Sequence, residues 1–235
     1  MAPPVTPDPR EGPLSRVLHG LQRAARTVLF HNLRLPLRLG LGLICRARLI
    51  GEERVPLCGG LIVAANHTSF ADPVVLQTFV PRRLTYLMTD KYYFVPVLHP
   101  LLRLWGVLVV KEQGLNKEVI RAAAGVLERG GALGIFPEGA ISRDGLVHDA
   151  QPGAALLARR AGVPILPVGL AGIGRLMPPD TWRLHRSRLT IYVGDPISPV
   201  GLSRRELAER LTRDLRAVAQ KAREENAGRG AAPFL

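Results

Sequence analysis

The sequence predicts an α/β fold, in which a mixed, partly parallel sheet is covered by helices and preceded by a basic amphipathic helical arm at the N-terminus. Short apolar runs that fit strands alternate with helical segments along most of the chain. Hydrophobic residues make up 47% of the 235 residues, which is enough for a substantial core. Glycine and proline are frequent, with 24 and 20 residues, as expected for many short elements joined by turns.

The N-terminal part of the chain is basic and amphipathic. Apolar residues recur at helical spacing over 14–29, and a second leucine-rich stretch covers 32–44 with Pro36 near its start. No acidic residue occurs between Gly12 and Gly51, whereas the same stretch holds arginines at Arg16, Arg23, Arg26, Arg34, Arg38, Arg46 and Arg48. Two such helices suit a membrane interface, with arginines at anionic headgroups and leucines among the acyl chains. The alternative is an ordinary helical hairpin packed against the core with solvated arginines.

The rest of the chain carries the alternating pattern, and no internal repeat or low-complexity linker divides it. We expect a flexible leader over 1–13, membrane-docking helices over 14–46, one catalytic domain over 47–226 and a loose tail over 227–235. The predicted strands are Ala47–Ile50, Leu61–Ala65, Leu84–Met88, Val107–Val110, Ala132–Phe136, Ile165–Gly169 and Arg188–Val193. The predicted helices are Pro73–Phe79, Tyr92–Leu104, Lys117–Arg129, Gly153–Ala161 and Ser203–Glu225, the last opened by a capping box of Ser203 and Glu206.

Charge and cysteine content narrow the possible partners. The net charge of +13 and the pI of about 11.0 indicate an anionic partner: nucleic acid, an anionic membrane leaflet or a phosphorylated small molecule. The chain has no recognisable nucleic-acid motif or aromatic stacking cluster, so no nucleic acid is expected. Cys45 and Cys58 fit neither a metal cluster nor a disulfide scaffold, which agrees with a cytosolic setting. No window of about 20 apolar residues predicts a transmembrane helix, and the proline-rich leader does not resemble a secretory signal.

The segment from Leu61 to Pro73 holds a histidine and an aspartate five positions apart. A buried strand is predicted to end at Asn66, where α/β proteins usually bind ligands, and a polar loop leads to a helix at Asp72. If His67 lies in the loop and Asp72 at the helix start, the carboxylate can bond one ring nitrogen and leave the other as a base. The alternative is structural: Asp72 as an N-cap before Pro73, or as one half of a capping box with Ser69.

A second polar loop follows the predicted strand Ala132–Phe136. The run Phe136-Pro137-Glu138-Gly139 is followed by Ser142, Arg143 and Asp144. A carboxylate, backbone amides and a cation on one loop suit a polar acceptor that carries hydroxyl and phosphate groups. A plain turn with a solvated Glu138 is the alternative. No G-x-S-x-G elbow occurs, so a serine hydrolase is not indicated.

Together, the two motifs resemble those of the glycerolipid acyltransferases, the lysophosphatidate (1-acylglycerol-3-phosphate) acyltransferase family. Asn66-His67 with Asp72 is similar to the NHxxxxD signature, and 136–139 is similar to the FPEG block, in the expected order. The resemblance covers roughly 47–200. Weaker similarities lie at Gly51, Lys91, Gly106–Lys111 and Val163–Pro167.

The resemblance implies that His67 is the general base and Asp72 its orienting partner, and that Glu138 and Gly139 belong to the acceptor site. Phe136, Pro137 and Ser142 of the same loop are further candidates for binding the acceptor, and Lys111 and Arg143 are candidate cations for its phosphate. It also implies an acyl-CoA or acyl-carrier-protein donor, a lysophospholipid acceptor, an anionic membrane surface as partner, and no metal or organic cofactor. The expected location is the cytoplasmic face of the cell membrane, with peripheral or monotopic attachment. Backbone amides near the FPEG loop are candidates for stabilising the oxyanion.

Two positions depart from the family pattern. The FPEG block usually continues with Thr-Arg, but Ala140-Ile141 follows here, and the block after Gly106 usually ends in arginine, where this chain has Lys111-Glu112. Both family arginines are implicated in binding the acceptor phosphate, and lysine lacks the bidentate fork of arginine. The leading interpretation is acylation of lysophosphatidate. The alternatives are a non-phosphorylated lipid alcohol as acceptor, or a non-enzymatic basic module that binds membrane or nucleic acid.

Overall fold

The computed structural model describes residues 34–89, 107–110, 116–179, 181 and 183–228. The chain enters it in a helix over 34–44 that leads directly into the first strand. The strands are β1 (Cys45–Ile50), β2 (Leu61–Ala65), β3 (Leu84–Thr89), β4 (Leu108–Val110), β5 (Ala132–Ile135), β6 (Ile165–Ala171) and β7 (Ser187–Val193). The helices are α2 (Asp72–Phe79), α5 (Lys117–Glu128), α6 (Gly153–Ala161), α7 (Ile173–Leu176) and α8 (Arg204–Gly228), with a 3₁₀ turn η1 (Glu52–Arg54).

The seven described strands form one sheet in the order β1-β7-β6-β2-β5-β3-β4. Neighbouring strands run parallel except β6 and β7, which are antiparallel. The predicted mixed, partly parallel sheet is therefore confirmed. Because β2, β5 and β6 are parallel neighbours, their carboxyl ends meet at one edge of the sheet, where ligands bind in this fold class.

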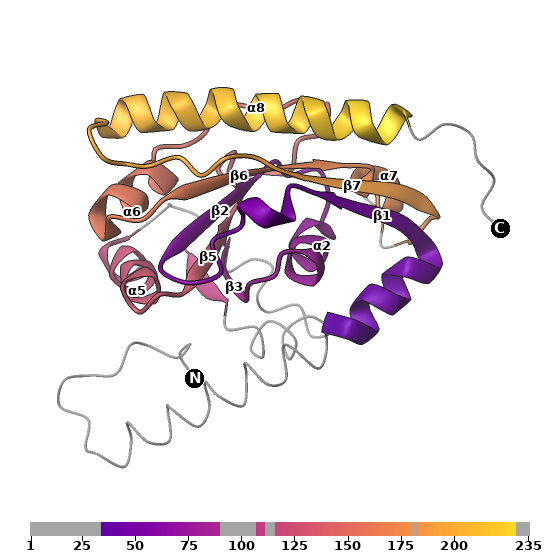
Figure 1. Ribbon diagram of the computed structural model, residues 1–235, viewed down its shortest axis with the longest axis horizontal. Helices are drawn as coiled ribbons and strands as arrows, with labels where there is room; N and C mark the ends of the chain where they lie inside the picture. The colour runs from indigo at the N-terminus through magenta and orange to yellow at the C-terminus, as the bar shows by residue number, and fades with distance from the viewer. Residues whose placement is uncertain (1–33, 90–106, 111–115, 180, 182, 229–235) are drawn as a thin grey trace, which may run out of the picture.

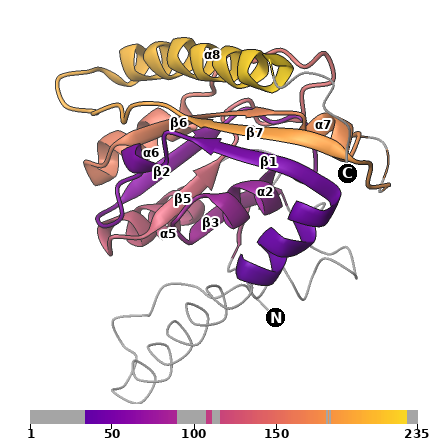
Figure 2. The ribbon, with the colours of Figure 1, turned by 45° about the vertical axis from the view of Figure 1, so that its right-hand side comes forward.

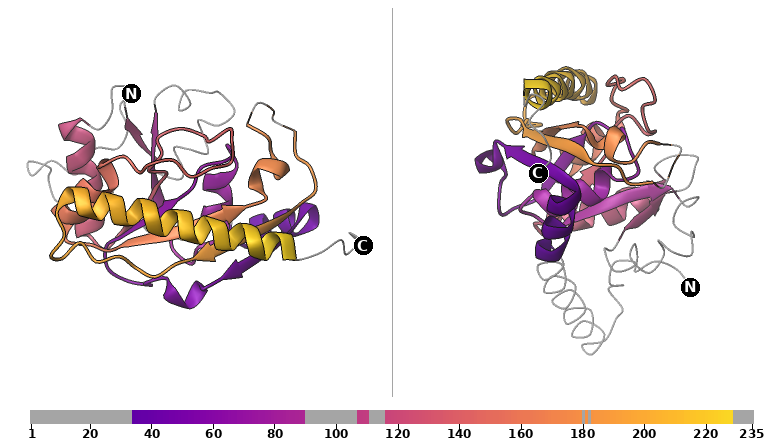
Figure 3. Two further views of the ribbon diagram at one scale, coloured as in Figure 1. Left: turned by 90° about the horizontal axis from the view of Figure 1, so that it is seen from above. Right: turned by 90° about the vertical axis from the view of Figure 1, so that its right-hand side faces the viewer.

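Helices cover both faces of the sheet, so its central strands are buried on both sides. The side chains of β2 are fully buried, and alternate residues face opposite layers. Leu61 and Val63 pack with α2, whereas Ile62 and Ala64 pack with α5, α6 and α8. Figure 1 shows α8 lying along the upper face, and the view from above in Figure 3 shows it crossing the strands obliquely.

Most predicted elements lie within a few residues of the observed ones. β2 and α6 have the predicted bounds, whereas β1 begins earlier, at Cys45, and β6 extends to Ala171. The helix predicted over 203–225 runs from Arg204 to Gly228, so residues 227 and 228, predicted as loose tail, are helical. The capping box is confirmed, because Ser203 N donates to Glu206 and Glu206 N donates to the Ser203 hydroxyl.

Several predictions concern parts of the chain that the structure does not describe. These are the leader, the first arm helix over 14–29 and the predicted helix Tyr92–Leu104. The structure also adds two short elements that the sequence pattern did not indicate, η1 and α7. Both are single turns, too short to show helical periodicity.

Helix 34–44 packs against the body through one face and exposes leucines on the other. The Arg34 side chain donates to the carbonyls of Thr78 and Phe79 at the end of α2, at 2.8 and 2.9 Å. The guanidinium of Arg38 lies 5.5 Å from the centre of the Phe79 ring. These two arginines of the arm therefore serve to dock the helix. Figure 2 shows this helix beside α2, leading into β1.

The opposite face of the same helix carries large exposed apolar side chains. Leu35, Leu39 and Leu43, spaced four residues apart, are 63%, 63% and 83% exposed. The spacing places them along one side of the helix. Across the residues that the structure describes, none of the helices has the length and apolar character needed to span a bilayer.

Candidate active site

The loop between β2 and α2 places a histidine at the carboxyl edge of the sheet. β2 ends at Ala65, and the buried side chain of Asn66 continues the strand pairing toward β6. Its amide nitrogen donates to Leu170 O at 3.1 Å and its oxygen accepts from Leu170 N at 2.7 Å. This pair of bonds anchors the start of the loop, so that His67 follows a rigid strand end.

His67 and Asp72 are hydrogen-bonded to each other. Nδ1 of His67 lies 2.8 Å from Oδ2 of Asp72, whose side chain is 0% exposed, while the His67 side chain is 17% exposed. The same Oδ2 accepts the backbone N–H groups of Thr68 at 2.6 Å and Ser69 at 2.8 Å. Since this oxygen is an acceptor, Nδ1 donates to it, and Nε2 carries the lone pair that can take a proton.

The structural alternatives for Asp72 are met only in part, because the N-cap of α2 is Ala71 and not Asp72. Asp72 is the first residue of α2 with Pro73 after it, and Ser69 N donates to its carboxylate as in a capping box. The Ser69 hydroxyl instead accepts from Ala71 N at 3.1 Å and donates to Met177 O at 2.6 Å. The loop therefore closes around Asp72 and is tied to the segment after α7.

An aromatic stack supports the histidine ring from one side. The rings of His67 and Phe136 lie 4.1 Å apart at 19°, and the ring of Tyr86 lies 6.3 Å from that of Phe136 at 8°. The Tyr86 hydroxyl donates to Pro73 O at 2.9 Å. Burial and, secondarily, the nearby Asp72 raise the pKa of Tyr86 well above 10.0. A Cβ on Gly134, the partner of Tyr86 in β5, would lie 2.3 Å from the Tyr86 ring.

Glu138 joins two loops by accepting backbone N–H groups with both carboxylate oxygens. Oε1 accepts from His67 N at 2.9 Å, and Oε2 accepts from His148 N at 3.0 Å. The carbonyl of His67 in turn accepts from Ser142 N at 2.8 Å. The backbone of His67 is thus held on both sides by the loop that follows β5. Glu138 therefore positions the histidine loop. Its role in binding the acceptor substrate stays a prediction.

The remaining residues of the second loop form a compact turn. Pro137 is buried, and Gly139 adopts φ 78°, where a Cβ would lie 2.3 Å from the Gln151 amide. The N–H of Gly139 donates to Phe136 O. The amides of Gly139 and Ser142 are therefore used within the fold, which leaves fewer candidates for the oxyanion contact predicted from the sequence.

Ser142 and Arg143 have different surroundings. The Ser142 hydroxyl is buried and donates to Asp144 at 2.7 Å. Asp144 also accepts from Leu146 N and bonds the ring of His148. The bond from Leu146 N, with that from Ser142, lowers the pKa of Asp144. Arg143 is exposed to solvent at the tip of this loop.

The structure brings most of the predicted site together. His67, Asp72 and Phe136 are in contact, Glu138 and Ser142 bond the backbone of His67, and Lys111 lies outside the described residues. Sequence reasoning missed Tyr86, although Gly134 inside a strand is a signal that a bulky group approaches there. In the described ranges, no three His, Cys, Asp or Glu side chains are grouped as metal ligands.

Fold and site together define a class. An α/β sheet carries a His–Asp pair at its carboxyl edge, and among the described residues no serine or cysteine side chain is hydrogen-bonded to the ring. This arrangement suits a general base acting on a hydroxyl that the substrate supplies. A family model described as Acyltransferase matches residues 46–171, more than half of the chain, so the chain belongs to the acyltransferase family.

Individual relatives agree with this family. The chain is 27% identical over 119 residues to the chloroplast 1-acyl-sn-glycerol-3-phosphate acyltransferase of Brassica napus. The matched region covers 50% of this chain and 34% of that protein. It is 27% identical over 150 residues to the 1-acyl-sn-glycerol-3-phosphate acyltransferase of Borreliella burgdorferi, with coverage of 61% and 57%. The matches thus span between a third and just over half of these relatives' lengths.

A solved structure shares the fold. The crystal structure of the 1-acyl-sn-glycerophosphate (LPA) acyltransferase from Thermotoga maritima has a TM-score of 0.76 and 23% identity to this chain. The similarity covers 90% of this chain and 85% of that one. It confirms the predicted fold class.

Proposed function

We propose that the protein is an O-acyltransferase that transfers a fatty acyl group from an acyl thioester to a hydroxyl of a lysophospholipid. The leading reaction converts lysophosphatidate to phosphatidate in phospholipid synthesis, with acyl-CoA or acyl-carrier protein as donor. The observation that carries the proposal is the hydrogen bond from His67 Nδ1 to the buried Asp72, at the edge where this fold binds ligands. Membership of the acyltransferase family and the names of the relatives support it.

The chemistry follows from the free lone pair on Nε2 of His67. Nε2 takes the proton of the acceptor hydroxyl while its oxygen attacks the thioester carbonyl carbon, which gives a tetrahedral oxyanion. Asp72 stabilises the imidazolium and keeps the ring oriented. The intermediate collapses with cleavage of the C–S bond, and the thiolate takes the proton back from Nε2. The proposed transfer needs the two substrates and the pair of side chains, and we expect it to use no metal or organic cofactor.

The identity of the acceptor is the part of the proposal with a specific rival. Ile141 and Glu112 stand where the family pattern has arginines, and this favours a lipid alcohol without a phosphate. Arg143 is exposed on the loop whose backbone bonds that of His67. It is a candidate to replace the two family arginines in binding a phosphorylated acceptor. Its guanidinium can bond a phosphate in bidentate fashion.

Measuring free thiol released from a long-chain acyl-CoA tests the proposed reaction. Purified protein in detergent or lipid is given lysophosphatidate, monoacylglycerol or no acceptor. Release that requires lysophosphatidate supports the leading reaction. Release with monoacylglycerol alone would retain acyl transfer and replace the acceptor. No release with any acceptor, from acyl-CoA or acyl-carrier protein, would contradict an acyltransferase.

A membrane surface is the proposed partner, with peripheral or monotopic attachment to the cytoplasmic face. Leu35, Leu39 and Leu43 line the solvent side of helix 34–44, and an interfacial helix buries such a face among acyl chains. Because Arg34 and Arg38 are used for docking onto α2, the leucines carry the contact from this helix. Replacing the three leucines by serine should weaken sedimentation with phosphatidylcholine vesicles. Unchanged sedimentation would assign the contact to other residues.

A further inference from the structure

A second polar site lies at the same end of the molecule as the candidate active site, but on the face covered by α8. A pocket of about 300 Å³ opens where α7, the start of β7 and the end of α8 meet. Figure 1 shows these three elements together at the right-hand end, next to the start of β1. The pocket is lined by Arg175, Arg186, Ser187, Arg188, Asn226 and Ala227.

Positive charge is concentrated in this pocket. Among the residues that the structure describes, its lining holds three arginines and no carboxylate. Along β7, Arg188 alternates with the buried Ser187 and Leu189, so it shares the α8 side of the sheet with Thr190, and Arg186 directly precedes the strand. Three guanidinium groups that line one pocket make its electrostatic potential favourable for an anion.

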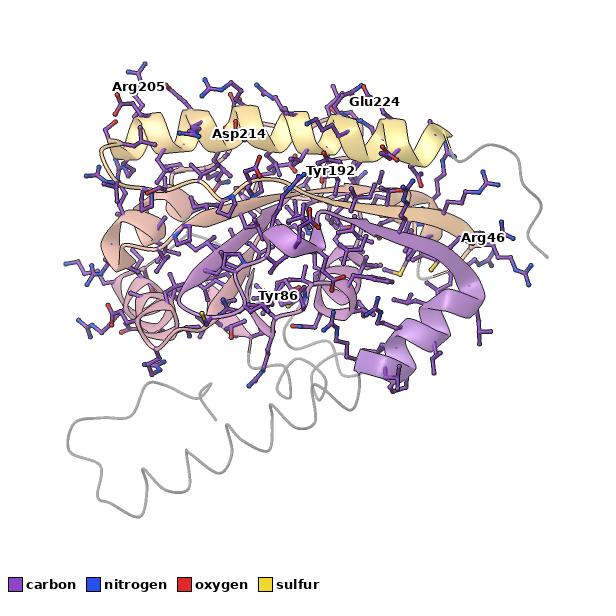
Figure 4. All side chains as sticks on the ribbon, viewed as in Figure 1. Arg46, Tyr86, Tyr192, Arg205, Asp214 and Glu224 are labelled. Carbon is purple, nitrogen blue, oxygen red and sulfur yellow. The ribbon has the colours of Figure 1, made fainter. Side chains whose placement is uncertain are left out.

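The neighbouring strand adds a further cation. Arg46 of β1 is the direct partner of Arg188, and paired residues of neighbouring strands point to the same side of a sheet. Figure 4 shows Arg46 at the right-hand end of the molecule. Arg46 therefore adds a cation beside the pocket at the start of β1.

Hydrogen bonds fix the polar groups between the arginines. The hydroxyl of Ser187 donates to Gly172 O at 2.8 Å, which ties β7 to the start of α7. The hydroxyl of Thr190 donates to the side-chain oxygen of Asn226 at 3.1 Å. That bond uses the acceptor of Asn226 and orients its amide nitrogen, which supplies N–H donors. Arginine forks and amide donors around one small opening are the groups that bind phosphate.

The position of the pocket indicates where its ligand comes from. Arg175 follows Gly174, where an added Cβ would lie 3.4 Å from Thr68 O, so α7 touches the histidine loop. Leu184 lies two residues before Arg186 and is 55% exposed. The exposed Leu43 of the arm lies two residues before β1 begins at Cys45. Exposed leucines thus accompany the arginines on this end of the molecule. Apolar side chains beside cations suit a bilayer surface.

We propose that the pocket formed by Arg175, Arg186, Arg188 and Asn226 binds the phosphate of an anionic phospholipid headgroup. The lipid belongs to the leaflet that helix 34–44 contacts, and the inference rests on the proposed function only for the presence of that leaflet. Binding at the pocket gives the protein a second membrane contact, on the other face of the sheet from the arm. Two contacts hold the carboxyl edge with His67 toward the lipid.

Vesicle sedimentation with a matched pair of double variants tests this site. Arg175→Gln/Arg186→Gln removes two exposed pocket charges. Arg159→Gln/Arg160→Gln removes two exposed charges from the last turn of α6, at the opposite end of the sheet. On phosphatidylcholine vesicles with about one-fifth phosphatidylglycerol, the pocket variant should bind roughly ten- to thirty-fold more weakly than wild type, from about 1 kcal/mol per arginine. The α6 variant should stay within about two-fold, because its charges are distant and screened.

A third variant leaves every arginine in place. Asn226→Asp keeps an oxygen for the Thr190 hydroxyl and adds a negative charge to the pocket. It should weaken binding to the anionic vesicles and leave binding to pure phosphatidylcholine unchanged. Equal losses in the pocket and α6 variants, or wild-type binding by Asn226→Asp, would overturn the proposal in favour of diffuse attraction.

One further outcome tests the source of the phosphate. If inorganic phosphate at constant ionic strength displaces the wild-type protein from anionic vesicles and binds it calorimetrically, a free anion is the ligand and the lipid assignment is wrong. No acyl donor is present in these measurements, so failure of the acyltransferase proposal would not change them. Circular dichroism of each variant confirms that it is folded.

Discussion

The carboxylate of Asp72 accepts the Nδ1–H of His67 at 2.8 Å while it is completely buried and bonded to two backbone amides. The proposed catalytic pair is therefore built into the turn that starts α2. The orientation of the His67 ring depends on the geometry of this turn. The loop after β5 fixes that geometry, because Glu138 and Ser142 bond the backbone of His67.

The variant Asp72→Asn tests whether the carboxylate matters for catalysis. Asparagine has the same size, but its amide cannot accept both backbone N–H bonds and the ring N–H as the carboxylate does. We expect kcat to fall by roughly 10²- to 10⁴-fold, the range for loss of a general base or its orienting partner. Asp144→Asn is the matched control, because Asp144 also bonds a histidine ring and a backbone N–H but lies on the exposed loop. Equal losses in both variants would remove the special role of Asp72.

Glu138→Gln tests the link between the two loops. Glutamine offers one acceptor oxygen where the carboxylate offers two, so either His67 N or His148 N loses its partner. We expect a loss of about 1–3 kcal/mol in the free energy of unfolding, together with a lower kcat and little change in KM for the acceptor. A rise in KM with unchanged kcat would instead support the acceptor-binding role predicted from the sequence. Glu206→Gln, in the capping box of α8, is the control for losing a carboxylate that accepts a backbone N–H.

Sequence alone could predict the contact between His67 and Asp72 because the two residues are five positions apart and the loop between them is local. The contact from Glu138 to His67 spans 71 positions, and the contact from Asn66 to Leu170 spans 104. Both need the strand order, in which β5 and β6 lie on either side of β2, and no local pattern specifies that order. Periodicity placed the strands and the longer helices, but it cannot detect single turns such as α7, whose Arg175 lines the basic pocket.

Tyr86→Phe should change how stability depends on pH. Burial, helped by the nearby Asp72, raises the pKa of Tyr86 well above 10.0, so the phenol stays neutral in the folded state and ionises in the unfolded state near pH 10. Its contribution to stability is full below pH 10 and is lost as the pH rises above it, at about 1.4 kcal/mol per pH unit. Urea unfolding from about pH 8 to pH 11 should show a smaller alkaline loss in the phenylalanine variant than in wild type. Parallel curves would contradict this account.

Arg82→Met tests the opposite edge of the sheet. The buried Arg82 guanidinium donates to the carbonyls of Pro56, Cys58, Gly59 and Gly130, at 2.7–3.3 Å. Burial lowers the pKa of Arg82, and the four carbonyl oxygens stabilise its charge. Without it, buried carbonyls lose their donors, and we expect about 3 kcal/mol or more of destabilisation with unchanged kcat in the folded protein.

Arg205→Met is the control for Arg82→Met. Arg205 pairs with Glu209 on the surface of α8, where Figure 4 shows it at the left-hand end, and an exposed pair of this kind adds little to stability. Thermal unfolding should therefore shift clearly for Arg82→Met and hardly at all for Arg205→Met. Similar shifts in the two variants would show that the carbonyl contacts of Arg82 do not stabilise the fold.

The most direct test of the central claim is acyl transfer by His67→Ala, measured as thiol release from acyl-CoA with the acceptor that the wild-type protein uses. His148→Ala is the matched control, because its ring lies on the adjoining loop and its backbone N–H to Glu138 is retained. If His67 is the general base, the His67→Ala protein should fold normally and lose at least about 10²- to 10⁴-fold in rate, while His148→Ala stays near wild type. A folded His67→Ala protein with near-normal turnover would contradict the account.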